Sequence, residues 1–112
     1  MFRTFAVGAL ILGALLFVVG GVSWAAKTHA QEAVDHTKEA IDHGKQGHAD
    51  VLAKHAETAL THAKAAQKEK PDMHLDEGIK HLEGAVASGK KGDAPGGTKH
   101  AEEALTHLSQ AK

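Results

Sequence analysis

The chain beyond its first two dozen residues combines apolar positions spaced three and four apart with histidines spaced seven apart. A seven-residue step returns to nearly the same face of an α-helix, drifting only ~20° per step. With each histidine at heptad position g, the apolar residues fall at positions a, d and e. Position a holds Ala30, Ala49, Ala56, Ala63, Leu75, Leu82, Ala101 and Leu108, position d holds Ala33, Ala40, Leu52, Ala59, Ala85 and Ala104, and position e holds Val34, Ile41, Leu60, Ile79, Val86 and Leu105. This pattern predicts amphipathic helices that bury one stripe in a bundle.

Capping and breaking residues divide the pattern into four helices. Thr28 with Gln31 forms a capping box that begins a helix ending at about residue 43, before a tight reversal at 43–48. A second helix should run over about 48–69 and end before Pro71, and Asp72 should cap a third over about 73–88. The glycine-rich segment 89–97 predicts a mobile loop, after which Thr98 caps a short helix to about residue 110. We therefore expect an all-α, antiparallel up-down four-helix bundle formed by residues 26–112.

The N-terminal residues 1–25 have the features of an export signal. Arg3 gives a short basic start, and Phe5 to Val22 is a run of eighteen residues without a charge. Ser23 and Ala25 are small residues at the positions that signal peptidases read. We interpret the segment as a cleaved secretory signal, with an uncleaved anchor as the alternative, because the run approaches the ~20 residues that span a bilayer.

Composition removes several function classes. The formal net charge is −1, and all aromatic residues lie in the export segment, so no basic, aromatic surface for nucleic acid is present. The chain has no cysteine, which excludes disulfides and thiolate ligands. Alanine dominates the predicted core, so the bundle should be only marginally stable without help from metal or self-association.

The histidines and the glutamates between them predict metal binding. Glu32, Glu39, Glu77 and Glu103 each follow one histidine by three residues, and each lies on the same helix face as that histidine. Histidines seven apart are separated by a rise of ~10.5 Å and cannot share an ion. A site should therefore combine a Glu–His pair on one helix with a histidine from a neighbour. The candidate ligands are His29, Glu32, His36, Glu39, His43, His48, His55, His62, His74, Glu77, His81, His100, Glu103 and His107.

The second helix departs from this rule, because Val51 and Thr58 stand where the other helices have glutamate. Its histidines should act as lone donors to sites organised by another helix. Imidazole and carboxylate together suit Cu(II), Ni(II) or Zn(II), with Cu(II) our first choice. If a signal peptidase cut after Ala26, Lys27-Thr28-His29 would form an additional terminal site for Cu(II) or Ni(II).

Other interpretations of the histidines remain open. Glu–His pairs can simply form a solvated helix face, at ~0.2–0.5 kcal/mol per pair. Histidines that gain charge together as the pH falls below ~6 could instead make a pH-responsive structural or interaction protein. A di-metal oxidase would need Glu-x-x-His motifs, and the spacing from Glu32 to His36 is one residue too long. We therefore expect a binding protein and not an enzyme.

The segments His29-Ala-Gln-Glu-Ala-Val-Asp, His36-Thr-Lys-Glu-Ala-Ile-Asp and His100-Ala-Glu-Glu-Ala-Leu-Thr give the chain a likeness to a known family. The mature chain resembles the small metal-binding protein (SmbP) family, which is exported and built on histidine-bearing heptads. The resemblance implies a periplasmic four-helix bundle that binds several divalent metals, copper above all, and buffers or sequesters them. It implies metal ions as partners, with no nucleic acid and no membrane after signal cleavage.

Overall fold

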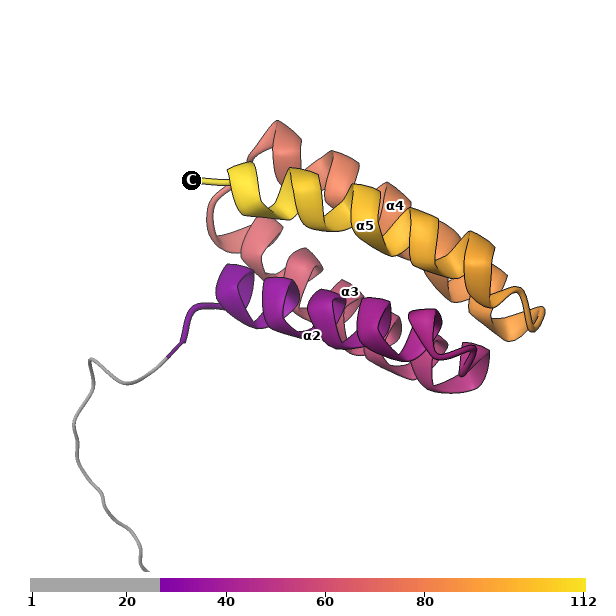
Figure 1. Cartoon of the computed structure of the whole chain (residues 1–112). Coiled ribbons are helices and arrows are strands. Elements are labelled where there is room, and N and C mark those ends of the chain that lie inside the picture. The colour runs from indigo at the N-terminus through magenta and orange to yellow at the C-terminus, as the bar shows by residue number, and fades with distance from the viewer. Residues whose placement is uncertain (1–26) are drawn as a thin grey trace, which may run out of the picture.

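Four antiparallel helices form the computed structural model, which describes residues 27–112 (Figure 1). They are α2 (His29–Lys45), α3 (Ala49–Glu69), α4 (Met73–Lys90) and α5 (Ala94–Gln110). The first hairpin, α2 with α3, forms one layer, and the second hairpin, α4 with α5, forms the other. Helix α3 packs on α4 and α2 packs on α5, which closes the bundle. The predicted all-α antiparallel four-helix architecture is confirmed.

The predicted export segment, residues 1–25, lies outside the described residues. Within residues 27–112, none of the helices combines the length and apolar character needed to cross a bilayer.

The helix starts show why these segments are helical. At α2 the Gln31 backbone N–H donates to Thr28 Oγ1 at 3.1 Å, and the Thr28 N–H donates to Gln31 Oε1 at 2.9 Å, which is the predicted capping box. At α4 the His74 N–H donates to Asp72 Oδ1 at 2.7 Å, also as predicted.

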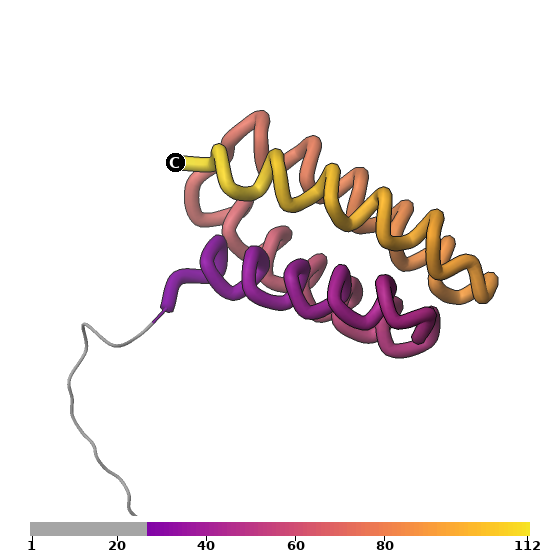
Figure 2. The backbone as a smooth tube through the Cα atoms, viewed as in Figure 1, coloured from indigo at the N-terminus to yellow at the C-terminus, as the bar shows by residue number. Residues whose placement is uncertain are grey.

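The two hairpin turns lie at the same end of the bundle (Figure 2). They are alike, since each contains a glycine with positive φ, Gly47 at 84° and Gly92 at 82°. Only glycine adopts this conformation without a steric penalty.

The prediction of a loop over 89–97 with a helix beginning at Thr98 is wrong for most of that segment. Helix α4 continues to Lys90, and α5 begins at Ala94 with Asp93 as its cap, because the Gly96 N–H donates to Asp93 Oδ1 at 2.9 Å. Pro95 lies in the first turn of α5, where the missing N–H costs nothing. Ala94 and Gly97 are buried at positions a and d of the same heptad register. Tertiary packing of these small residues therefore outweighs the weak helix propensity of the glycines.

The core follows the predicted register. All residues assigned to positions a and d are buried except Ala30 and Ala49, which are half-buried, while most residues at position e lie at the half-buried edge. Thr37, the one buried polar side chain among the described residues, donates its hydroxyl to the Ala33 carbonyl at 2.7 Å. The core is mostly alanine, as expected, and leucine side chains fill the larger spaces between the layers.

Glycines at core positions let helices approach closely, both within the second hairpin and between the two hairpins. A Cβ at Gly78 would lie 2.6 Å from Leu108 Cδ2, and one at Gly97 would lie 2.9 Å from Leu52 Cδ2. Each leucine therefore fits over a backbone without a side chain, which fixes the relative position of neighbouring helices.

Candidate metal centres

All ten histidines lie along the two helix–helix contacts inside the hairpins. In an antiparallel pair the g positions of both helices face each other, so rings from the two helices alternate along the contact. Neighbouring ring centroids are 5.2–6.0 Å apart in the first hairpin and 5.4–6.2 Å apart in the second. The first imidazole row runs His48, His43, His55, His36, His62, His29, and the second runs His74, His107, His81, His100.

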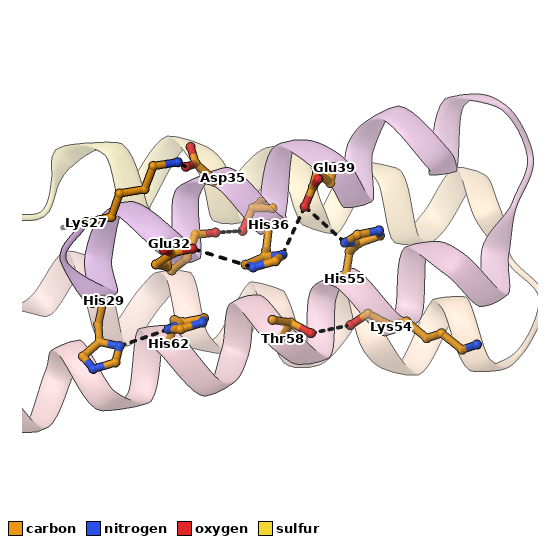
Figure 3. A network of polar contacts seen from close by, with 12 residues as sticks. Lys27, His29, Glu32, Asp35, His36, Glu39, Lys54, His55, Thr58 and His62 are labelled. Atoms are coloured by element: carbon orange, nitrogen blue, oxygen red, sulfur yellow. Dashed lines mark hydrogen bonds and ion pairs between the residues drawn. The ribbon is translucent and has the colours of Figure 1, made fainter. Parts of the chain in front are cut away.

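Two triads of ligating atoms form on the first row, each with all its donor atoms within 4.8 Å of one another. One, which we call the first inner triad, joins His36, Glu39 and His55. Glu39 Oε1 lies 3.1 Å from His36 Nδ1 and 3.3 Å from His55 Nδ1, so one carboxylate oxygen faces rings from both helices (Figure 3). The other, the first flanking triad, joins Glu32, His36 and His62, with His36 Nε2 3.8 Å from Glu32 Oε1.

Two triads also form on the second row. In the second inner triad Glu103 Oε1 lies 3.4 Å from His81 Nδ1 and 3.9 Å from His100 Nδ1. The second flanking triad joins Glu77, His81 and His107. One histidine is therefore shared by both triads of each hairpin, His36 in the first and His81 in the second.

Each of the four triads has the composition expected from the sequence, a Glu–His pair on one helix and a histidine from the other. Helix α3, which has no carboxylate three residues after a histidine, contributes only histidines, His55 and His62, to glutamates of α2. Ten of the candidate ligands meet in triads, namely Glu32, His36, Glu39, His55, His62, Glu77, His81, His100, Glu103 and His107. The structure does not bring His29, His43, His48 or His74 into such a group.

These four remaining histidines extend the rows. His29 Nδ1 lies 3.0 Å from His62 Nδ1, and its Nε2 lies 3.8 Å from Glu69 Oε2 (Figure 3 shows the two rings). Glu69 is a carboxylate near the row that the sequence reasoning did not include among the ligands. Its position g, seven residues after His62, was the available signal.

The rings are held in a partly buried setting that leaves nitrogen atoms without partners. The side chains of His36, His55 and His81 are 27%, 28% and 26% exposed. The Nδ1 atoms of His36, His43, His100 and His107 are buried and make no hydrogen bond, and the approach of Glu39 to His36 lacks hydrogen-bond geometry. Such a buried polar atom costs about 1–3 kcal/mol when it is unsatisfied. A cation that accepts the nitrogen lone pair would remove this cost, so the donor set fits a metal ion of the kind that binds nitrogen and oxygen.

Asp35 faces a different partner from the glutamates. It accepts a hydrogen bond from the Lys27 ammonium, which lowers the pKa of Asp35 and raises the pKa of Lys27 (Figure 3). Asp35 is therefore paired with a lysine and belongs to none of the four triads.

A family described as small metal-binding protein matches residues 6–111, nearly the full chain. No curated protein matches the sequence.

Proposed function

Because the chain belongs to the small metal-binding protein family, we propose that it is a periplasmic binding protein that buffers divalent transition metals and is not an enzyme. Its cargo is Cu(II) first, then Ni(II) and Zn(II), held at open sites of histidine and glutamate. The observation that carries the proposal is the pairing of rings and carboxylates along both rows, which places donor atoms from two helices within 4.8 Å of one another.

The chemistry of these donors supports divalent ions of the later first transition series. Donor atoms around a four-coordinate ion with bonds of ~2.0–2.1 Å lie roughly 3.3 Å apart. The two separations from Glu39 Oε1, 3.1 and 3.3 Å, already have this value. With nitrogen and oxygen donors, affinity rises from Ni(II) to Cu(II) and falls again at Zn(II), which favours copper as the preferred ion.

The partial exposure of the rings supports a buffer rather than a permanent metal site. Ligand side chains about one quarter exposed leave an ion open to water and to exchange with other ligands. Metal binding also requires neutral imidazole, so protons compete with the ion as the pH falls. The protein should then release its cargo when the surroundings become acidic or when a stronger ligand is present.

Metal titration with unfolding measurements tests the proposal. Purified mature protein, stripped with a chelator, should gain thermal stability when Cu(II), Ni(II) or Zn(II) is added at neutral pH, and Mg(II) serves as the control. Free ion at 100 times the Kd would stabilise the fold by about 2.7 kcal/mol per site. If none of the three transition metals raises the Tm, the protein is not a metal buffer.

The same experiment weighs the pH-responsive alternative. Helix content that collapses in acid in the presence of chelator, with no effect of metal at neutral pH, would favour a proton switch. The location is tested separately by osmotic release of the periplasm followed by measurement of the mass of the chain, which also shows whether the N-terminal segment has been removed.

A further inference from the structure

The two hairpins are copies of one sequence unit. Adding 45 to the residue number converts four histidines of the first hairpin into the four of the second, as the pairs His29/His74, His36/His81, His55/His100 and His62/His107 show. The same shift relates Gly47 to Gly92, the two glycines with positive φ. It also relates the turn hydrogen bonds, because His48 N–H donates to the His43 carbonyl and Asp93 N–H to the Ser88 carbonyl, both at 2.9 Å. Positions related by the shift are therefore structurally equivalent.

The carboxylates of the inner triads do not follow this repeat. The position equivalent to Glu39 holds Gly84, and the position equivalent to Glu103 holds Thr58. The first hairpin therefore takes its inner carboxylate from its first helix, and the second hairpin takes it from its second helix. Both carboxylates nevertheless reach the Nδ1 atoms of the equivalent histidine pair, His36 with His55 and His81 with His100.

A steric reason accounts for the side on which each carboxylate lies. At Gly84 a Cβ would lie 2.8 Å from His100 Nδ1 and 2.9 Å from His100 Cε1, so the ring occupies the space that a side chain would need. Thr58 is exposed and donates its hydroxyl only to the Lys54 carbonyl of its own helix, at 3.2 Å (Figure 3). A side chain at position 84 would therefore displace the His100 ring from its present position, whereas the exposed position 58 accepts a glutamate without displacing a ring.

We infer that the two inner triads are equivalent principal metal sites, one per hairpin, in which the carboxylate can be donated from either helix. The inference rests on the proposed function and adds to it the positions at which ions are bound most tightly. In both inner triads one oxygen lies within 4 Å of two ring nitrogens, which brings together three of the four donors around a four-coordinate ion. The flanking triads share His36 or His81 with an inner triad, and in the first hairpin Glu32 Oε1 lies 3.8 Å from His36, against 3.1 Å for Glu39 Oε1. The flanking triads should therefore fill second and bind more weakly.

Moving the carboxylate tests the inference. Cu(II) is titrated into the full mature chain against a competing chelator of known affinity, and circular dichroism confirms that each variant remains helical. The wild type should hold two ions tightly. Glu39→Ala should reduce this number to one, with affinity at the first inner triad lowered by at least ~10-fold. Adding Thr58→Glu to this variant should restore two tight ions.

Two controls separate the site from general charge effects. Asp42→Ala removes an exposed acid of the same helix α2 and should leave two tight ions. In the second hairpin Glu103→Ala should leave one tight ion, and adding Gly84→Glu should not restore the second, because the new side chain would displace the His100 ring, which is itself a ligand of this site.

The outcomes distinguish this inference from the proposed function. A wild-type chain that takes up no copper overturns both. If the wild type binds copper, any one of three results would overturn the inference and leave the proposed function standing. Glu39→Ala could keep two tight ions, or Thr58→Glu added to Glu39→Ala could fail to restore the second tight ion. Gly84→Glu added to Glu103→Ala could, against expectation, restore the second tight ion.

Discussion

The two hairpins have the same backbone arrangement but carry different side chains. The first is richer in histidine, and the second is richer in buried leucine. The first contributes six histidines and only one of the four buried leucines, Leu52. The second contributes four histidines and the other three, Leu75, Leu82 and Leu108. Positions equivalent to these three leucines hold Ala30, Thr37 and Ala63. The second hairpin therefore supplies more of the large buried side chains, and the first hairpin supplies more of the imidazole rings.

The row ends show the same division. His43 and His48 extend the first row to the hairpin turn, where the equivalent residues of the second hairpin are Ser88 and Asp93. Asp93 instead caps α5, and this helix starts with Ala94 and Pro95. At its turn the first hairpin therefore has two imidazole rings. At the equivalent positions the second hairpin has a residue that caps its second helix with a side-chain hydrogen bond.

The largest effect is expected from truncating the core of the second hairpin. Leu82→Ala removes a fully buried side chain and should lower the free energy of unfolding by about 2–5 kcal/mol. The equivalent change in the first hairpin, Thr37→Ala, deletes a hydroxyl that bonds only its own helix and should cost much less. Urea unfolding in chelator measures both. Equal losses of unfolding free energy would show that the leucine of the second hairpin stabilises the core no more than the residue at the equivalent position of the first.

A smaller effect is expected at two equivalent glycines in the last turns of α2 and α4. A Cβ at Gly89 would meet backbone, 2.8 Å from the Ala49 carbonyl oxygen and 3.1 Å from the Ala53 nitrogen, whereas at Gly44 it would meet side-chain atoms of Thr98 and Leu52. Side chains can rotate away and backbone cannot. Gly89→Ala should therefore destabilise by about 1–3 kcal/mol and Gly44→Ala by less, as measured by thermal unfolding without metal. The comparison fails if Gly44→Ala is the more damaging change.

The outer rings of the first row should matter little for tight binding. The double variant His43→Ser, His48→Asp replaces the two histidines at the turn of the first hairpin with the residues found at the equivalent positions of the second. We expect the tightly held Cu(II) to be unchanged and only weakly held ions to be lost, because neither ring belongs to a triad. Copper counted after passage over a chelating resin and after simple desalting separates the two classes. Loss of a tight ion would place a principal site at the turn.

The smallest effect concerns the helix starts. Asp72 accepts hydrogen bonds from the Lys112 and His74 N–H groups, which lower its pKa below the usual value. A lowered folded-state pKa gives stability that is present above the unfolded value of ~3.9 and is lost as the pH falls through the folded value. The equivalent start of α2 is capped by the neutral Thr28 and should lack this dependence. Asp72→Asn should flatten the acid end of the stability profile, and Thr28→Ala should shift the profile without changing its slope.

Part of this architecture follows from local sequence alone. Heptad spacing assigned the core stripe, the cap residues Thr28 and Asp72 located two helix starts, and Pro71 located the break between the hairpins. Local propensity predicts a loop over 89–97 because glycine and proline are poor helix formers in isolation, although Ala94 and Gly97 continue the heptad register. The 45-residue repeat was also present in the sequence, and aligning Gly47 with Gly92 would have revealed a second turn in place of a long loop.

Sequence by itself determined which face of each helix carries imidazole, because a period of seven needs only the geometry of one helix. Only the tertiary structure decided which carboxylate serves which ring. That choice depends on the axial offset of neighbouring helices, which is set by distant contacts such as Leu52 over Gly97 and Leu108 over Gly78. Glu103 thereby comes to face His81 of another helix, at 3.4 Å, more closely than His100 of its own, at 3.9 Å.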